Sequence, residues 1–451
     1  MRKTKFRNKR KRNFIFIFLS VLMLAIALTF GYIAMHNTNS NQDKNSDITA
    51  TAQSDTTPTV ESDITDQTGQ STQSEPSEVS PSTATNIDNV DPIKAQIEKM
   101  SLEEKVGQLV IVGVDGYKND DHSAQMIKKH HVGGFILFKN NIQDTKQMLA
   151  LLNSLKETNL DNKVPLFLSV DEEGGRVSRL PAEFLKFPTN KKIGELNDSY
   201  LSYQIGSIIG EELKSVGFNM DFAPVLDINS NPKNTVIGDR SFGSKVDLVS
   251  ELGIQTMKGL QSKSIISVVK HFPGHGDTSV DSHIGLPTVN YDMDRLKSFE
   301  LMPFAAAIEN KVDAVMVAHI LLPKIDPNNP ASFSKTIISD ILRADMGFDG
   351  VVLTDDFTMG AIIKNYDIGE AAVKSIQAGS DIVLVCHEFD KQEAVINALK
   401  NAAATGKISR DRLDQSVYRI LKLKEKYSFS SETVKSVDPQ SINNKIKKLF
   451  K

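Results

Sequence analysis

The sequence predicts an α/β fold, a (β/α)8 TIM barrel, in which eight parallel strands alternate with helices. About eight short apolar runs recur between residues 109 and 385, and amphipathic helical stretches separate them. Polar residues follow the C-terminal ends of several runs, where barrel enzymes build their active sites. The competing architecture, an open doubly wound sheet, usually carries a glycine-rich phosphate turn after its first strand, and the residues after Val114 supply none.

The expected strands are short and aliphatic, as strands buried on both faces are. They cover residues 109–114, 134–138, 166–170, 218–223, 265–269, 314–317, 351–353 and 382–385. The polar residues just past their ends are Asp171, Asp227, Lys270, His271, His319 and Asp355. Ser101 and Glu104 form a capping-box pattern near the start of the barrel. A final amphipathic helix is expected over about residues 410–424.

The residues ahead of the barrel do not have the composition of a globular domain. Residues 1–13 form a basic flank, and an uncharged, predominantly apolar run follows over residues 14–35. At the helical rise this run spans roughly 30 Å, the thickness of a bilayer core. We therefore expect a transmembrane anchor whose basic flank stays in the cytoplasm, with the rest of the chain on the other side. The alternative is a signal peptide that is cleaved, which would give a secreted protein.

Three further segments complete the expected organisation. Residues 36–90 are rich in Ser, Thr, Asn, Gln and Asp, and this composition predicts a disordered linker. The barrel is expected over residues 91–428 as a single catalytic domain, with no second α/β domain after it. We interpret residues 429–451 as a mobile or loosely packed tail.

Charge and cysteine content argue against several classes of ligand. The formal net charge is −3 although the N-terminal flank is basic, so no strongly basic surface remains and nucleic acid is not expected as a partner. Cys386 is the only cysteine, which excludes an internal disulfide and a cysteine-rich zinc site. His271 and His275 have the spacing of a helical zinc motif, but Pro273 and Gly274 break a helix and no Glu lies between them. We expect neither a metal nor another cofactor.

One carboxylate and one carboxylate–imidazole pair are the candidate catalytic groups. Asp355 follows the strand at 351–353, which would deliver it to the rim, although a rim aspartate can also be purely structural. Asp356 should point elsewhere, because side chains alternate along a strand. Asp281 and His283 are two residues apart in a loop, so the carboxylate could orient and polarise the imidazole for proton transfer. His275 is interpreted as a residue that packs the loop.

Several blocks of the sequence resemble one enzyme family. Residues 270–283 read Lys-His-Phe-Pro-Gly-His-Gly-Asp-Thr-Ser-Val-Asp-Ser-His, which resembles the signature of family 3 glycoside hydrolases in their β-N-acetylhexosaminidase branch. Residues 171–177 read Asp-Glu-Glu-Gly-Gly-Arg-Val and, with Arg179, resemble that branch's substrate-binding turn, where Gln is commoner at the second place. Blocks at 221–227, 238–242 and 354–359 also match, and the likeness covers roughly residues 95 to 425.

The resemblance implies roles for individual residues. Asp355 would be the nucleophile that forms a covalent glycosyl-enzyme, and His283, polarised by Asp281, would be the general acid/base. The residues that would hold the sugar are Asp171, Arg179, Arg240, Lys270 and His271. This agrees with the chemistry, because retaining hydrolysis needs a nucleophile and a proton-transferring group about 5 Å apart. Buried sugar hydroxyls, in turn, need charged or bidentate partners.

The implied function is an exo-acting, retaining β-N-acetylhexosaminidase that removes terminal β-linked N-acetylglucosamine. Its expected substrates are muropeptides, and its expected location is the outer face of a bacterial cytoplasmic membrane. Three alternatives stay open: a β-glucosidase-type hexosidase, an N-acetylglucosamine phosphorylase of the same superfamily, and a non-catalytic wall-binding protein. A histidine acid/base would admit phosphate where a carboxylate would repel it, whereas a wall-binding protein would be expected to have lost Asp355 or His283. The oligomeric state does not follow from the sequence.

Overall fold

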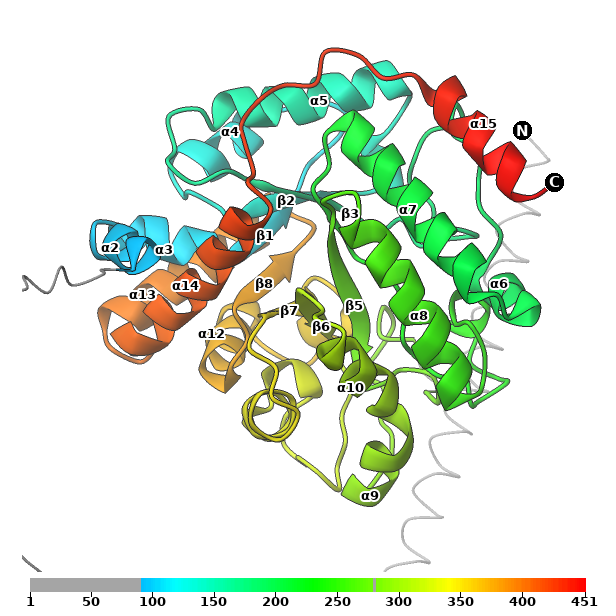
Figure 1. Cartoon of the computed structure of the whole chain (residues 1–451). Coiled ribbons are helices and arrows are strands. Elements are labelled where there is room, and N and C mark those ends of the chain that lie inside the picture. Colours follow the sequence, from blue (N-terminus) through cyan, green and yellow to red (C-terminus); the bar gives the residue numbers. More distant parts are fainter. Residues whose placement is uncertain (1–90, 279–280) are drawn as a thin grey trace, which may run out of the picture. The chain divides into compact units, whose positions relative to one another are not determined.

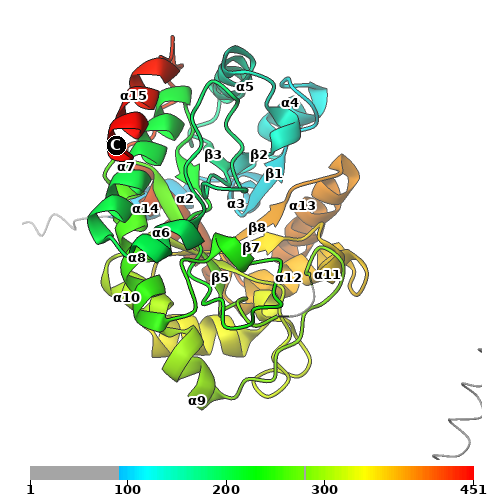
Figure 2. The same ribbon diagram turned by 90° about the vertical axis from the view of Figure 1, so that its right-hand side faces the viewer.

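The computed structural model describes residues 91–278 and 281–451. They contain a closed barrel of parallel strands in which each strand pairs with the next and β8 pairs with β1, with the helices on the outside (Figures 1 and 2). The predicted (β/α)8 barrel is confirmed. The strands are β1 (Val110–Gly113), β2 (Gly134–Leu137), β3 (Phe167–Val170), β4 (Met220–Asp221), β5 (Ile266–Phe272), β6 (Ala314–Val317), β7 (Val351–Asp356) and β8 (Ile382–Val385).

Three strands differ from their expected ranges by more than one residue at an end, and each difference bears on the rim. β5 continues to Phe272 and β7 to Asp356, so both strands carry polar rim residues within the ladder itself. β4 pairs over only two residues. Pro224 has no N–H to donate beyond that point, and the chain stays beside β5 through single bonds, such as Lys270 N–H to the Pro224 carbonyl at 3.2 Å.

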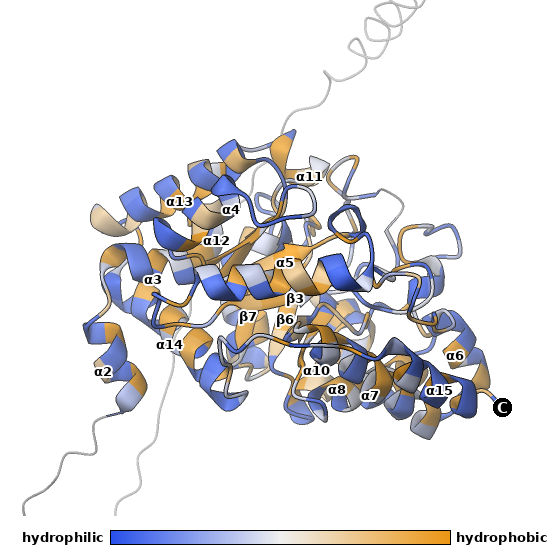
Figure 3. Ribbon diagram, turned by 90° about the horizontal axis from the view of Figure 1, so that it is seen from above, coloured by the Kyte–Doolittle hydropathy of each residue, from blue (hydrophilic) through white to orange (hydrophobic). Residues whose placement is uncertain are grey.

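The helices form a layer around the barrel, with apolar faces inward and hydrophilic faces outward (Figure 3). They are α2 (Pro92–Glu98), α3 (Leu102–Gln108), α4 (Asp121–Lys128), α5 (Thr145–Thr158), α6 (Asn190–Leu196), α7 (Ser199–Val216), α8 (Val246–Gln261), α9 (Met293–Arg295), α10 (Met302–Glu309), α11 (Gly360–Ile363), α12 (Ile368–Ala378), α13 (Phe389–Ala404), α14 (Arg410–Lys426) and α15 (Pro439–Leu449). Shorter 3-10 and π segments are η1 (Lys139–Asn141), η2 (Gly238–Arg240), η3 (Leu296–Glu300), η4 (Ala331–Phe333) and η5 (Thr336–Asp345).

Local sequence signals account for several of these boundaries. The expected capping box begins α3, where Ser101 Oγ accepts the N–H of Glu104 and the Glu104 carboxylate accepts the N–H of Ser101. Gly217 ends α7 in the left-handed region, with φ of 103°. Gly206 allows α7 and α8 to lie close together, because it has no Cβ. A Cβ at this position would fall 2.3 Å from the Thr256 carbonyl oxygen.

A buried ionic cluster joins β8 to helices at the end of the barrel opposite the rim. Asp381, immediately before β8, is fully buried and accepts hydrogen bonds from Arg343 at 2.6 Å and Arg412 at 3.1 Å. Arg419 lies 3.4 Å from the same carboxylate, which also accepts the N–H of Val352. Burial would raise the pKa of Asp381, but the three guanidinium groups hold it below its ordinary value.

The C-terminal segment is ordered, so the prediction of a loosely packed tail is wrong. α15 packs against α7 (Figures 1 and 2), and Ile442 and Ile446 are buried in the main apolar core. These two residues are four apart, on one face of a helix whose N-terminus is capped by Asp438. Asn443 adds hydrogen bonds to the backbone of residues 183 and 185. Apolar burial on one helical face is the reason that the segment docks.

The basic flank, the transmembrane anchor and the disordered linker, expected at residues 1–13, 14–35 and 36–90, lie outside the described residues. Within the part of the chain that the structure covers, no helix is both long and apolar enough to cross a membrane.

Candidate active site

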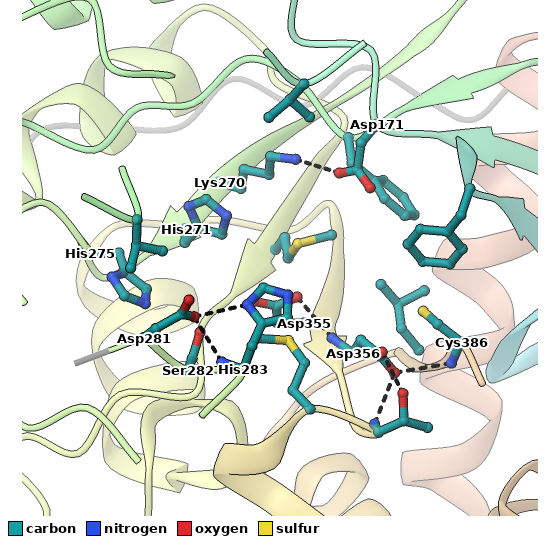
Figure 4. A pocket seen from close by; sticks show the side chains of 18 of the residues that line it. Asp171, Lys270, His271, His275, Asp281, Ser282, His283, Asp355, Asp356 and Cys386 are labelled. Carbon is teal, nitrogen blue, oxygen red and sulfur yellow. Dashed lines mark hydrogen bonds and ion pairs between the residues drawn. The ribbon is translucent and has the colours of Figure 1, made fainter. Parts of the chain in front are cut away.

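A pocket of about 510 Å³ lies at the C-terminal ends of the strands, within the usual range for a small ligand. All eight site residues predicted from the sequence line it, and Figure 4 shows most of them facing the same space. Two of the polar rim residues, Asp227 and His319, stand behind the lining instead. The strands therefore bring together residues that are up to 184 positions apart, from Asp171 to Asp355.

A buried network of alternating charges forms one wall of the pocket. Lys270 Nζ lies 2.5 Å from Asp171 and 2.7 Å from Glu173, and its side chain is almost fully buried. Arg240 from η2 holds the same Glu173 in a bidentate pair at 2.7 and 2.8 Å. Burial raises the pKa of Glu173, but the charges of Arg240 and Lys270 outweigh burial and lower it. Glu173 is therefore a carboxylate at neutral pH.

Lys270 and Arg240 are held in their charged forms by the same contacts. Burial lowers the pKa of Lys270, yet the carboxylates of Asp171 and Glu173 raise it above its ordinary value. Because each cation already faces a carboxylate, the pocket can offer charged donors to sugar hydroxyls without leaving a bare buried charge.

His271 is oriented by a carboxylate behind it. Its Nδ1 lies 2.6 Å from Asp227, which is fully buried. Its Nε2 lies 3.3 Å from Arg240, and because a guanidinium can only donate, this nitrogen is the acceptor. The ring proton is thereby assigned to Nδ1, facing Asp227. Asp227 also accepts the backbone N–H of His275 at 2.6 Å, so one carboxylate positions both the ring of His271 and the loop that follows.

His275 packs the loop, as expected from the sequence. Its side chain is buried, and Nδ1 lies 2.7 Å from the hydroxyl of Thr278. Burial, together with the nearby His271, lowers its pKa to about 4, so the ring is neutral. Within residues 91–278 and 281–451, no group of three or more His, Cys, Asp or Glu side chains is arranged to hold a metal ion.

Arg179 is the site residue with an uncommitted donor. Its backbone N–H donates to Glu172 at 2.7 Å, but its side-chain Nε is buried and has no hydrogen-bond partner in the described structure. Glu172 stands where the resembled family more often has Gln. Burial raises the pKa of Glu172, which brings it closer to the uncharged state of an amide.

Asp355 is the last residue but one of β7 and is the candidate nucleophile. Its carboxylate accepts the N–H of Asp356 at 2.8 Å. Burial would raise the pKa of Asp355, but neighbouring histidines, His319 foremost, and this N–H lower it below the ordinary value. The group is therefore a carboxylate at neutral pH, as a nucleophile must be.

Asp356 points away from Asp355, as predicted from strand alternation. It accepts hydrogen bonds from Thr358, at 2.9 Å from the backbone and 2.5 Å from the hydroxyl, and from the N–H of Cys386 at 3.0 Å. It thereby fixes the turn after β7 against the end of β8.

The structure brings Asp281 and His283 together as a pair. Asp281 Oδ1 lies 2.9 Å from His283 Nδ1 and accepts the backbone N–H of His283 at the same distance (Figure 4). These donors outweigh the effect of partial burial and lower the pKa of Asp281. The side chain of His283 is 70% exposed, whereas Asp355 is only partly exposed. With Nδ1 engaged, Nε2 is the nitrogen left to exchange a proton in the pocket.

Residues 101–423 match the family model of the glycosyl hydrolase family 3 N-terminal domain. The chain belongs to this family. As a family 3 hydrolase it is similar to β-hexosaminidase A of Pseudoalteromonas piscicida, at 36% identity over 69% of this chain but only 56% of that protein. β-Hexosaminidase of Nitrosomonas eutropha is 35% identical over 67% of this chain and 88% of its own length.

A solved structure gives the same assignment for the family 3 hydrolase. The family 3 β-N-acetylglucosaminidase from Paenibacillus sp. str. FPU-7 superposes with a TM-score of 0.74 at 41% identity, covering 78% of this chain and 68% of that one. These relatives place the chain on the β-N-acetylhexosaminidase branch, as its sequence motifs predicted.

Two site residues were not assigned a role by the sequence reasoning. Glu173 joins Lys270 to Arg240, and Asp227 orients His271. Both lie in blocks that matched the family, and Asp227 also follows an expected strand, so the sequence did mark both as candidate site residues. The sequence could not show that Glu173 approaches Arg240 and Lys270, which lie 67 and 97 positions further along the chain.

Proposed function

We propose that this family 3 hydrolase is an exo-acting, retaining β-N-acetylhexosaminidase that releases terminal, non-reducing β-linked N-acetylglucosamine. The observation that carries the proposal is an ionised carboxylate near the end of β7, Asp355, that lines the same pocket as an Asp281–His283 pair. A carboxylate nucleophile and a separate proton carrier are the two groups that retaining hydrolysis requires.

The first step forms a glycosyl-enzyme. The Asp355 carboxylate attacks the anomeric carbon as the glycosidic bond breaks, and His283 Nε2 gives its proton to the departing oxygen. Asp281 stabilises the positive charge that the imidazole carries before this transfer, because its carboxylate faces Nδ1 at 2.9 Å. In the second step His283 accepts a proton from water, the water oxygen bonds to the anomeric carbon, and Asp355 leaves as a carboxylate.

The wall formed by Asp171, Lys270 and Arg240 supports an exo mode of binding. Its charges are buried and mutually compensated, so they close that side of the pocket and can bind the hydroxyls of one terminal sugar. His271 stands beside them with its ring held between Asp227 and Arg240, and Arg179, which also lines the pocket, has no hydrogen-bond partner at its Nε in the described structure.

We propose peptidoglycan fragments as the natural substrate and the outer face of a bacterial membrane as the location. The support is the apolar run at residues 14–35 and the polar segment at 36–90, which would tether the barrel near the wall. Incubation with purified muropeptides should release free N-acetylglucosamine. Fractionation of cells should recover the chain with membranes, and recovery in the culture medium would support cleavage instead.

The mechanism is tested with 4-nitrophenyl β-N-acetylglucosaminide and the corresponding β-glucoside. Asp355→Ala should reduce kcat by at least about 10⁴-fold, because no other group replaces the nucleophile. Asp349→Ala is the matched control, since Asp349 lies just before the same strand with its side chain 81% exposed. Retained activity in Asp355→Ala rejects the mechanism, preference for glucose indicates the other hexosidase, and sugar phosphate formed in phosphate buffer indicates phosphorolysis.

A further inference from the structure

The loop that carries His283 rests on the segment after β7 through two hydrogen bonds. The backbone N–H of Ala361 donates to the Ser282 carbonyl at 2.9 Å. Lys364 Nζ donates to the Ile284 carbonyl at 2.7 Å. The two hydrogen bonds therefore hold the backbone carbonyls of the residues on either side of His283.

A glycine allows the close contact between these two segments. A Cβ on Gly360 would lie 2.4 Å from the His283 carbonyl oxygen, so no larger residue fits without a shift of the loop. Backbone thus packs directly on backbone, with Gly360 and Ala361 at the start of α11 as the receiving surface.

The Asp281–His283 pair cannot by itself fix the ring relative to the nucleophile. Both bonds of Asp281 run to His283, and the N–H groups of Ile284 and Gly285 turn back to the Asp281 carbonyl. These contacts hold the ring only within its own loop. In the described structure, the hydrogen bonds that leave residues 281–285 for another element are the two to Ala361 and Lys364.

The receiving segment is itself fixed to the nucleophile. It follows Asp355 directly in the chain, and Asp356 holds its first turn through Thr358 and the N–H of Cys386. The N–H of Met359 returns to the Asp356 carbonyl at 3.1 Å. A displacement of the loop on this segment would therefore change the position of His283, together with its neighbours Asp281 and Ser282, relative to Asp355.

We propose that Lys364 is a positioning residue for the proton transfer: its ammonium group, bound to the Ile284 carbonyl, holds the His283 loop in register with Asp355. The inference rests on the proposed function, because it assigns Lys364 a role only if His283 is the acid/base. Lys364 is exposed and lines the pocket, but in the described structure its ammonium group bonds to the Ile284 carbonyl and to none of the sugar-binding residues, so the contact that it makes is with the loop.

The test compares Lys364→Met with Lys364→Arg. Methionine keeps much of the side-chain length but removes the donor, whereas arginine keeps a charged donor that can reach a carbonyl. Lys335→Met is the matched control, because Lys335 is exposed and paired only with exposed Asp340, at 2.9 Å. Each variant is assayed for kcat/KM on β-N-acetylglucosaminides of 2,4-dinitrophenol, a good leaving group, and of methanol, a poor one.

The expected result is a selective loss. A displaced general acid matters most when the leaving oxygen needs a proton, so Lys364→Met should lose about tenfold on the methyl glycoside, or about 1.4 kcal/mol. The dinitrophenyl glycoside should change less than about twofold, because its departure needs little protonation. Arginine should restore most of the loss, and Lys335→Met should match wild type on both substrates.

Two outcomes overturn the positioning role. An equal fall in kcat/KM on both substrates together with a lower Tm would mean that Lys364 contributes only to stability. No change in kcat/KM on the methyl glycoside would mean that the bond from Lys364 to the Ile284 carbonyl does not affect proton transfer. His283→Ala tests the acid/base role of His283 separately from the role of Lys364. It should lose more activity on the methyl glycoside than on the dinitrophenyl glycoside, and by a larger factor than Lys364→Met. If His283→Ala does not discriminate between the leaving groups, the acid/base assignment fails, and the role of Lys364 falls with it.

Discussion

Glu173 should be essential to the integrity of the pocket although it needs no contact with the reacting atoms. Its side chain is 1% exposed, and it neutralises Lys270, which is 2% exposed, and Arg240, which is 14% exposed. Glu173→Gln would leave Lys270 with Asp171 as its carboxylate partner and would remove the one carboxylate that pairs with Arg240 in the described structure. Breaking a buried pair costs about 3–5 kcal/mol, and because Gln retains an acceptor oxygen we expect about 3 kcal/mol of unfolding free energy.

The loss can be measured by thermal unfolding and by steady-state kinetics. At about 2 °C per kcal/mol for a domain of this size, Tm should fall by roughly 6 °C. kcat/KM for the 4-nitrophenyl glycoside should also fall by about 10-fold or more, because Lys270 and Arg240 would lose their fixed positions. Glu195→Gln is the control, since Glu195 forms an exposed pair with Lys192 and should contribute less than about 1 kcal/mol.

The pH dependence of the unfolding free energy gives an independent check that the charge of Glu173 causes the loss. The pKa of Glu173 is lower in the folded chain than in the unfolded one. Its stabilising contribution is therefore complete above the ordinary glutamate pKa of about 4.5 and is lost as the pH falls towards the folded value. The gap in unfolding free energy between wild type and Glu173→Gln should be full at pH 7 and should narrow below about pH 4.5. A Tm within 1 °C of wild type at pH 7, or a gap that does not change with acid, would refute the reasoning.

Three further outcomes follow from the structure. Asp381→Asn should lower the unfolding free energy by about 3–5 kcal/mol, because three partly buried arginines lose their shared carboxylate; a loss below 1 kcal/mol in denaturant titration would contradict this. Removal of α15 should cost roughly 3 kcal/mol from the exposure of Ile442 and Ile446, whereas deletion without a change in stability would show that the helix is idle. Because the pKa of Asp355 is lowered, the nucleophile should stay ionised above about pH 4. kcat/KM for the dinitrophenyl glycoside should accordingly show no fall towards acid between pH 5 and 8 that is due to Asp355. A fall in this range that disappears in Asp355→Glu would argue against the lowered pKa of Asp355.

The barrel was predictable because its strands are buried on both faces. Five of the expected runs coincide with strands to within one residue at each end, since a continuous aliphatic run bounded by polar residues marks such a strand. β4 differed because pairing depends on what the chain does next, and Pro224 interrupts the donors just beyond it. β7 extended to Asp356 because polar residues can continue a ladder that apolar periodicity no longer marks.

The site was predictable where motif and strand end coincide. Asp355, Lys270 and His271 sit at the ends of recognisable strands, so the topology fixes their common edge. Glu173 was not assigned, because its role is defined by two cations from other elements, and a sequence does not show such distances.

The C-terminal error had a different origin. Asp438 and Pro439 form a helix-start signal, and Ile442 and Ile446 follow with helical spacing. The signal was therefore present in the sequence, but with few apolar residues around it the segment resembled a frayed end more than a docked helix.

The contrast between partly exposed Asp355 and mostly exposed His283 has an evolutionary consequence. The proposed nucleophile and the charged wall are fixed by strands and by one another, so changes there should disturb the fold and the binding of the proposed donor sugar together. The proton carrier lies on a loop held to its neighbour by two hydrogen bonds, one of them from an exposed lysine. Substitutions in that loop or in its receiving segment could alter which alcohols the enzyme releases while the recognised sugar stays the same. Descendants of this scaffold would then diversify first in the departing group and only later in the donor.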